Sequence, residues 1–416
     1  MAVSRVARSP LTLRALRLVA AVHAHGSLGG AAEALHLSAS TLSRAAQALE
    51  GKLGTSLFER GPRGMVLTPP AMALVRCHDR LQPLLRTRVL HLRSVPAGAA
   101  EAQRHAERLI RRLSEAMLAS LAATADAGSE TQAALRLGVT QPAVHQQLRA
   151  LEALCEEPLL RRAAGGWRLT EAGERWLHTA KLVLNELRLT EDELAHLLGR
   201  GERGVVVGVL PMASTGLLPQ AMARVWATDP ALRMTVVDGT YDALLERLRC
   251  GDVDLLIGPL RGVRAVPEVV EAVLFAEPLV VVAGRAHALV GRREPLTLQQ
   301  LLSWAWIASL PHTPARVGFD QLFADAGLSP PRPVVEANSP SLLRALLALG
   351  QHLALVSPLQ IAQELDQGEL VMLPVDTRSA VRQIGLTVRR QGRLPRGGER
   401  LVQALEALSG TARLAN

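Results

Sequence analysis

The side chains of this sequence that could do chemistry fall into two sets of mainly hydrogen-bonding and cationic groups. The first set comprises Ser38, Ser40, Thr41, Ser43, Arg44 and Gln47. The second set lies 102 positions later and comprises Thr140, Gln141, Pro142, His145, Gln146 and Arg149. Hydroxyl, amide and guanidinium groups are the ones that read base edges and hold phosphates in nucleic-acid complexes. These residues therefore indicate binding rather than bond making or breaking.

Patterns typical of catalytic sites are missing from the sequence. Gly51-Lys52 lacks the upstream glycine of a phosphate-binding loop, because Ala46 stands there, and no Gly-x-Ser-x-Gly elbow occurs. His23 and His25 have no further candidate ligands around them, which favours an exposed helix end over a metal site. We expect no catalytic residue, no cofactor and no metal. Three scattered cysteines suggest a reducing compartment and buried thiols: Cys77, Cys155 and Cys250.

Both polar sets belong to one unit that occurs twice, at residues 26–68 and 128–170. An ungapped match over 43 positions indicates a repeated supersecondary unit. In each copy, apolar residues at helical spacing would bury one face of a helix and leave the polar set facing outward. These apolar residues are Leu42, Leu49 and Leu53 in copy one, and Val144, Leu148 and Leu151 in copy two.

Each copy is typical of a winged helix-turn-helix. Ser38 or Thr140 would cap the outward-facing helix, since a side-chain oxygen accepts a hydrogen bond from an otherwise unpaired backbone N–H. Beyond that helix, residues 60–64 and 162–166 are typical of the turn of a β wing. Arginines of the two wings would bind phosphates, and these are Arg60, Arg63, Arg162 and Arg168.

Both copies resemble the DNA-binding domain of LysR-type transcriptional regulators. Copy one carries the family's Ala31-Ala32, Ser43-Arg44, Leu49-Glu50 and Leu57-Phe58-Glu59-Arg60. Copy two carries Thr140-Gln141-Pro142-Ala143-Val144, Leu151-Glu152 and Leu169-Thr170-Glu171-Ala172-Gly173. Copy two departs from the pattern with His145 in place of serine and Glu156 in place of glycine. The family normally has one such domain, so the duplication is the unusual feature.

The resemblance implies a cytoplasmic transcription regulator whose recognition helices enter the major groove of double-stranded DNA. It also implies a small-molecule effector, a homo-oligomer, and contact with RNA polymerase if the protein is an activator. The competing interpretation is a small-molecule-binding protein whose duplicated helical part serves assembly. An enzyme with a bilobal α/β domain ranks last, because no catalytic constellation is present.

The positive charge of the sequence is concentrated in the first copy. The net charge is +9, and residues 1–95 alone contain 13 Lys and Arg against 4 Asp and Glu. Residues 96–203 contain 14 against 15. A basic segment of this kind matches a phosphate backbone. Apolar content of 48% favours a globular chain, and we expect no membrane span because no long uncharged apolar stretch occurs.

After residue 203 strands and helices alternate, which predicts parallel sheets. Residues 205–210, 232–237 and 253–257 are expected as strands separated by helices, and a second such unit starts near residue 279. The resemblance makes this part a two-lobed, periplasmic-binding-protein-like effector domain. The fold class is therefore multidomain: two tandem winged helix-turn-helix copies, rich in α-helix, plus a bilobal α/β domain. The expected bounds are 1–95, 101–200 and 204–416, with lobe I at about 204–276 and 380–416 and lobe II at about 277–379.

An effector would bind between the lobes, where strands end and helix N-termini offer free N–H groups to an anion such as an organic acid. Three segments meet these conditions. The candidate effector residues are Met212, Ser214, Thr215, Thr240, Asn338 and Ser339. The alternative is that these hydroxyl groups only cap helices.

Each copy is followed by a helix that could pair with another, at residues 71–93 and 170–198. In the family such helices pair between two chains. Here they could pair within one chain, or the second could pair with its twin in another chain. The second is longer and richer in leucine, whereas Pro83 is expected to bend and interrupt the first. The sequence leaves both arrangements open.

Overall fold

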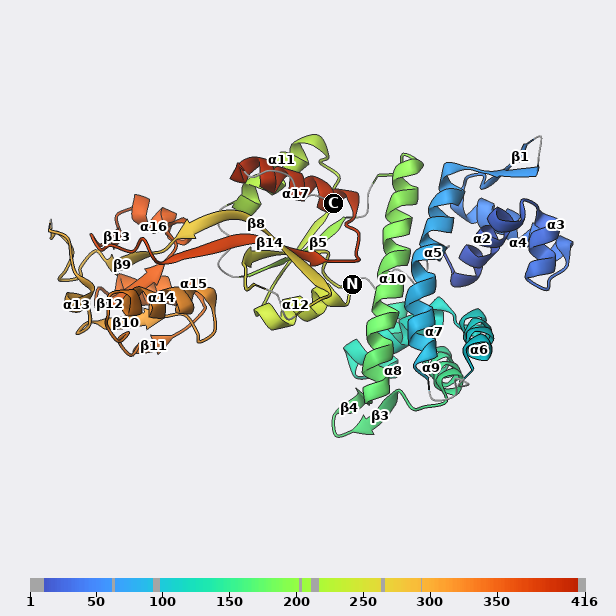
Figure 1. Cartoon of the computed structure of the whole chain (residues 1–416), viewed down its shortest axis with the longest axis horizontal. Coiled ribbons are helices and arrows are strands. Elements are labelled where there is room, and N and C mark those ends of the chain that lie inside the picture. Colours follow the sequence, from blue (N-terminus) through green and yellow to red (C-terminus); the bar gives the residue numbers. More distant parts are fainter. Residues whose placement is uncertain are drawn as a thin grey trace. The chain divides into compact units, whose positions relative to one another are not determined.

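The computed structural model describes residues 11–61, 64–92, 98–201, 204–210, 217–262, 266–292 and 294–410. The chain forms two compact units, each with its own cores, and Figure 1 labels their elements. Unit 1 is Met1–Arg203 with Cys250–Asp252, and unit 2 is Gly204–Arg249 with Val253–Asn416.

Copy one is a three-helix winged domain in unit 1. Its helices are α2 (Leu13–His25), α3 (Leu28–Ala34) and α4 (Ala39–Leu53), and its wing pairs β1 (Phe58–Gly61) with β2 (Gly64–Leu67). Ser27 caps α3 by accepting from the Gly30 N–H, and Ser38 caps α4 by accepting from the Thr41 N–H. The predicted apolar face of α4 is buried. The winged helix-turn-helix expected from the sequence is confirmed.

Copy two repeats this domain. Its elements are α7 (Glu115–Ala127), α8 (Glu130–Leu137), α9 (Gln141–Cys155), β3 (Leu160–Ala163) and β4 (Gly166–Leu169). The side-chain hydrogen bond that anchors each wing is also duplicated. The Leu57 N–H donates to Glu50 Oε1 at 2.7 Å, and the Leu159 N–H donates to Glu152 Oε1 at 2.9 Å. The two copies therefore share the hydrogen bond that anchors the wing as well as their sequence pattern.

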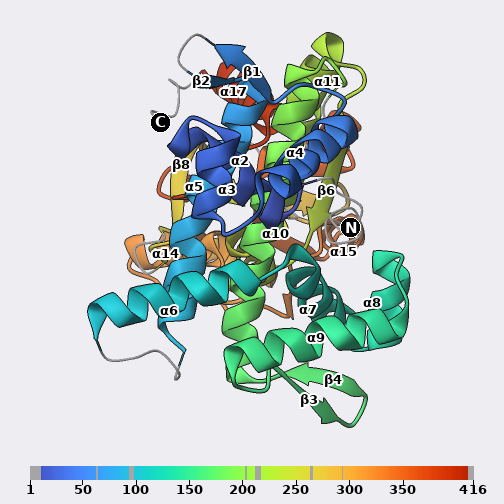
Figure 2. The ribbon, with the colours of Figure 1, turned by 90° about the vertical axis from the view of Figure 1, so that its right-hand side faces the viewer.

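Helix α5 (Pro69–Leu90) follows copy one, and α10 (Glu171–Leu197) follows copy two. The two long helices pack side by side, as Figures 1 and 2 show. Arg76 pairs with Glu193 at 2.7 Å, and Arg80 pairs with Glu186 at 2.7 Å. Because the later residue of one helix meets the earlier residue of the other, the pair is antiparallel. Pro83 lies inside α5 without ending it, so the expected interruption of this helix is wrong.

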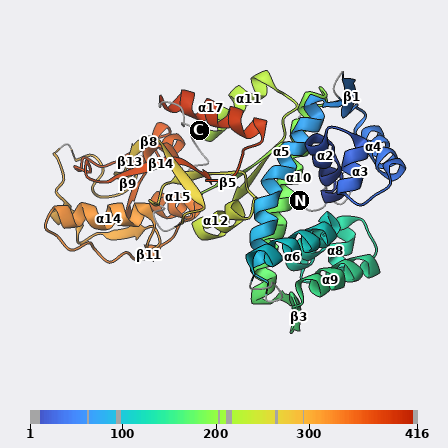
Figure 3. The same cartoon turned by 45° about the vertical axis from the view of Figure 1, so that its right-hand side comes forward.

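Helix α6 (Ala99–Arg112) joins the copies and packs on α5, as Figure 3 shows. It ends before α7, because Ser114 caps α7 by accepting from the Met117 N–H. Arg17 of copy one donates to the Ile110 carbonyl at 2.7 Å, and burial lowers the pKa of its guanidinium. Glu115 accepts from the Leu13 N–H at 3.1 Å. Copy one is thus bonded to the segment that begins copy two.

Lobe I of unit 2 is a five-stranded sheet in the order β6-β5-β7-β14-β8. Its strands are β5 (Val205–Val209), β6 (Met234–Asp238), β7 (Leu255–Pro259), β8 (Val269–Pro278) and β14 (Val381–Arg389). The first three are parallel, and β14 is antiparallel to both of its neighbours. Alternating valines of β5 contribute to the core with α11 (Leu217–Thr228) and α17 (Arg396–Ser409), while α12 (Tyr241–Arg249) belongs to a second core.

Lobe II is a five-stranded sheet in the order β11-β10-β12-β9-β13. Its strands are β9 (Val280–Gly284), β10 (Ala305–Ala308), β11 (Val335–Glu336), β12 (His352–Val356) and β13 (Leu370–Met372). Its helices are α13 (Leu298–Leu301), α14 (Pro314–Asp325), α15 (Pro340–Ala348), η1 (Pro358–Gln360) and α16 (Ala362–Asp366). Trp306, Phe319 and Phe323 pack edge to face in its core. The bilobal α/β fold is confirmed.

Candidate DNA-binding and effector sites

The outward face of α4 carries the polar residues predicted in copy one. Ser40, Arg44 and Gln47 are exposed, while Thr41 and Ser43 are half-buried. Ser38 is exposed at the helix start, where its Oγ also lies 2.7 Å from Thr41 Oγ1. The Arg44 side chain donates from Nε to the Ser40 carbonyl at 3.3 Å, which leaves its remaining N–H groups for a partner.

The corresponding face of α9 also points outward, but several of its side chains are hydrogen-bonded to carboxylates of the protein. Thr140 caps the helix by accepting from the Ala143 N–H at 3.4 Å. Gln141, Pro142, His145, Gln146 and Arg149 are all exposed. Gln141 and His145 nevertheless bond to Glu130, and Arg149 bonds to Glu152 at 3.3 Å. Copy two therefore presents a face whose side chains are oriented by carboxylates.

The wing arginines differ between the copies. Arg60 is exposed on β1, whereas the predicted Arg63 lies outside the described residues. In copy two Arg162 on β3 lies over the Trp167 ring, with Cζ 5.3 Å from the ring centroid. Arg168 is exposed on β4. Stacking of this kind holds a guanidinium without neutralising its charge, so both predicted arginines of the second wing stay cationic.

At the carboxyl ends of the parallel strands of lobe II lies a small pocket. It is lined by Ser309, Ala337, Asn338, Ser339, Pro340, Leu343, Arg344, Gln360 and Ile361. Two of the predicted effector residues, Asn338 and Ser339, are therefore brought together. Asn338 Oδ1 accepts from the Leu310 N–H at 3.1 Å, and Ser339 Oγ caps α15 by accepting from the Leu342 N–H at 3.3 Å.

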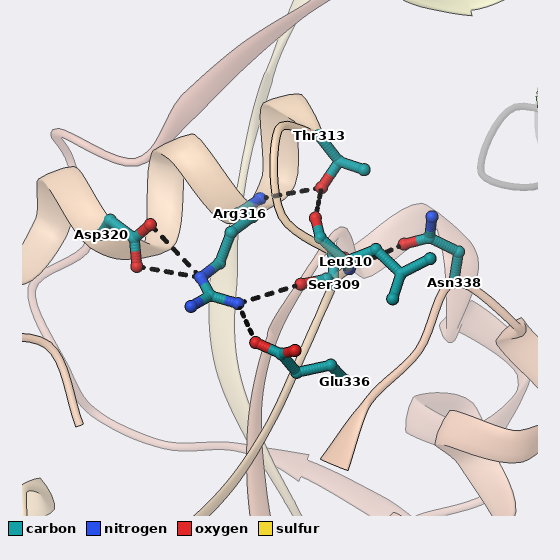
Figure 4. Close-up of polar contacts among 7 residues, drawn as sticks. All are labelled: Ser309, Leu310, Thr313, Arg316, Asp320, Glu336 and Asn338. Carbon is teal, nitrogen blue, oxygen red and sulfur yellow. Dashed lines mark hydrogen bonds and ion pairs between the residues drawn. The ribbon is translucent and has the colours of Figure 1, made fainter. Parts of the chain in front are cut away.

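Two arginines near this pocket have different roles. Figure 4 shows Arg316 between the ends of β10 and β11. Its Nη1 lies 2.5 Å from Oε1 of Glu336 in β11 and 3.4 Å from the carbonyl oxygen of Ser309, which directly follows β10. The hydrogen bond to Glu336 raises the pKa of Arg316. Arg344 lines the pocket itself and donates to the Gln360 carbonyl at 2.6 Å, with Glu364 as its ion partner at 3.0 Å. Arg316 therefore orders the strand ends, and Arg344 supplies a cation at the pocket wall.

Among the remaining effector candidates, the structure describes Thr240. It is exposed after β6 and does not line this pocket. Its Oγ1 accepts from the Ala243 N–H at 3.4 Å, so its hydroxyl group caps α12. Met212, Ser214 and Thr215 lie outside the described residues. Thr240 and Ser339 thus both cap helices, as the alternative interpretation of the sequence expected. Capping uses only the oxygen of each hydroxyl group as an acceptor, so its hydrogen can still bond to a ligand.

Comparison with known proteins assigns both units. Residues 13–72 and 116–174 each match the bacterial regulatory helix-turn-helix protein family, lysR type. Residues 199–409 match the LysR substrate binding domain. The chain belongs to the LysR family. It is a DNA-binding transcriptional regulator with an effector-binding domain, and the double-stranded DNA, small-molecule and homo-oligomer partners predicted from the sequence are those of this family.

Relatives within the LysR family support the same assignment. The HTH-type transcriptional regulator GalR of Pseudomonas putida is 35% identical over 365 residues, which cover 88% of this chain and 89% of that protein. Full-length OxyR of Pseudomonas aeruginosa shares the fold with a TM-score of 0.56 at 19% identity, over 70% of this chain and 94% of that one. CbnR in complex with its target DNA has a TM-score of 0.52 at 22% identity, over 70% and 99%.

Three residues of these sites were not found from the sequence. Glu130 contacts two residues of α9 from the preceding helix, Arg344 lines the lobe II pocket, and Arg316 joins two strand ends. Glu130 had a signal, because copy one has Leu28 at the matching position and an acid in an apolar position requires a partner. The two arginines had none, since each meets its partners only through the fold.

Proposed function

We propose that one chain of this LysR regulator reads two half-sites of its operator, with copy one and copy two acting as the two halves of a single-chain pseudo-dimer. The observation that carries the proposal is the antiparallel packing of α5 on α10. In this arrangement each copy stands at the N-terminal end of its own long helix, so the copies occupy opposite ends of the pair (Figure 2).

Two further features support this pairing. Arg76 and Arg80 each form an ion pair across the two helices, with Glu193 and Glu186 respectively. The Glu186 side chain is mostly buried there, at 13% exposure. One continuous apolar core also includes residues from both copies and both long helices. A chain of this kind needs no partner to bury the α10 face that α5 covers.

The deciding measurement is the mass of a fragment of residues 1–203, free and bound to DNA. We expect a monomer that protects two half-sites about one helical turn apart. An obligate dimer protecting the same span would eliminate the proposal. Charge reversal adds a second criterion: mixing Arg80→Glu chains with Glu186→Arg chains restores binding only if the helices pair between chains. Both changes in one chain should restore binding in either arrangement and serve as the control for the swap.

For unit 2 we propose a small organic acid as effector, held by Asn338, Ser339 and Arg344 from lobe II and by Thr240 from lobe I. The N-terminus of α15 and the Arg344 cation both favour an anion. The chain would act in the cytoplasm as a regulator, without catalysis of its own. Replacing Thr240 by Val, or Arg344 by Gln, should weaken the response to added effector without changing DNA binding in its absence. An effector located away from these lobe edges would rule the assignment out.

A further inference from the structure

Glu130 is a buried acid at the first position of α8, with 8% of its surface exposed. A buried carboxylate is costly unless it is paired. Its partners come from the recognition helix: Gln141 Nε2 donates to Oε2 at 2.6 Å, and His145 Nδ1 lies 3.2 Å from Oε1. The N-terminal end of α8 also favours a negative charge. The two partners are one helical turn apart and both are exposed.

Copy one contains none of these three groups. Leu28, Ala39 and Ser43 stand where copy two has Glu130, Gln141 and His145. The corresponding positions of copy one therefore offer no carboxylate, amide or imidazole group, whereas those of copy two form a hydrogen-bonded cluster. The carboxylate and its two partners form one arrangement that distinguishes the two recognition faces.

An ionised carboxylate can only accept hydrogen bonds. The Gln141 amide must therefore turn its nitrogen to Glu130, which leaves Oε1 free to face outward. The same argument places the proton of a neutral His145 ring on Nδ1, so that Nε2 is an acceptor. Glu130 thus orients the Gln141 amide with its oxygen outward as an acceptor, and a neutral His145 ring adds a second outward acceptor at Nε2.

We propose that Glu130 is a positioning residue that sets the base preference of copy two, a role that rests on the proposed reading of DNA by both copies. Two acceptors match the exocyclic amino groups of cytosine and adenine in the major groove, and they do not match the N7 and O6 acceptors of guanine. Arg44 of copy one differs from this pair, because its guanidinium has only donors and can bind phosphates at any sequence.

The test selects duplexes from a random-sequence pool with the full-length protein and its variants. Glu130→Gln removes the charge at the same size, and Glu130→Leu reproduces the residue of copy one. Both variants free the Gln141 amide to turn. We expect each to lose about tenfold of the preference for cytosine or adenine at one or two neighbouring positions of one half-site. Affinity for random duplex should not fall, since a negative charge near DNA is removed.

Glu171→Gln is the matched control. Glu171 also stands at the first position of its helix, but its side chain is 89% exposed and contacts Arg175 instead of a recognition residue. Its replacement should leave base preference unchanged. A purely structural role of Glu130 would alter the melting temperature without altering preference at particular positions. In a chain that already carries Gln141→Ala and His145→Ala, Glu130→Gln should have no further effect on preference.

The outcomes separate this inference from the function on which it rests. If Gln141→Ala changes base preference and neither Glu130 variant does, the positioning role is refuted while reading by copy two stands. If Gln141→Ala changes no preference but Gln146→Ala does, only the present inference fails. If neither variant changes preference, copy two does not read bases and both proposals fail.

Discussion

A buried ion pair joins the two strands that connect the lobes of unit 2, and its removal gives the largest stability change we expect. Glu277 on β8 and Arg382 on β14 are register partners, and each is 4% exposed. Arg382 Nε and Nη2 both lie 2.5 Å from Glu277 Oε2. The hydroxyl group of Ser357 donates to the other carboxylate oxygen, Oε1. Replacing Glu277 by Ala leaves a buried guanidinium and a buried hydroxyl group without their acceptor.

Breaking a buried pair from one side costs about 3–5 kcal/mol. For a unit of this size each kcal/mol lowers the melting temperature by about 2–4 °C, so the transition of unit 2 should fall by roughly 10 °C. Calorimetry of the full-length protein measures it. The double variant Glu277→Leu with Arg382→Met should recover most of the loss, because apolar replacement of both partners is often neutral. A shift below about 3 °C for Glu277→Ala, or a double variant as unstable as the single one, would refute the reasoning.

Three further predictions concern unit 1. Glu156 ends α9 with φ 56°, a left-handed conformation that disfavours side chains, so Glu156→Gly should stabilise copy two by about 1 kcal/mol in urea unfolding; a loss of stability would contradict this. Burial raises the pKa of the Cys155 thiol to about 12, so we expect mass spectrometry to find no alkylation of Cys155 in the folded chain at pH 8. The unfolded thiol titrates near 9, so the stability this thiol contributes is complete below that pH and is lost as pH rises toward 12. Arg44→Ala should weaken binding to all duplexes and reduce the salt dependence, whereas Gln146→Ala should change which sequences are preferred; equal effects would contradict that division.

The helix-turn-helix copies could be predicted from the sequence because their determinants are local. Ser38 and Thr140 cap the helices that their positions indicate, and the apolar residues of α4 and α9 recur at a spacing that only a helix brings to one face. Repetition strengthened the prediction, since two divergent segments with the same caps and the same spacing are hard to explain by any other fold.

Long-range features could not be read in this way. Strand β8 was missed, because Val269–Pro278 is a mostly apolar run with acids only at Glu271 and Glu277, shows no regular alternation, and pairs with β14 far along the chain. The effect of Pro83 was overestimated: α5 packs along α10, and tertiary packing outweighs the loss of one helical hydrogen bond. Only part of the lobe II pocket could be predicted. Asn338 and Ser339 were found because they directly follow a strand in the sequence, whereas Arg344 reaches the pocket from within the next helix.

The duplication has a consequence for how the two recognition faces can differ. In a symmetric dimer every substitution occurs at both half-sites, so the two faces stay identical. In a chain that carries both copies, Glu130 can occur without an acid at Leu28, and 13 basic residues can gather in the first 95 residues while the second copy stays near neutral. One copy can then supply most of the electrostatic affinity while the other discriminates between bases. An operator for this regulator should accordingly be asymmetric, with unequal half-sites, and a palindrome of either half should bind more weakly than the natural pair.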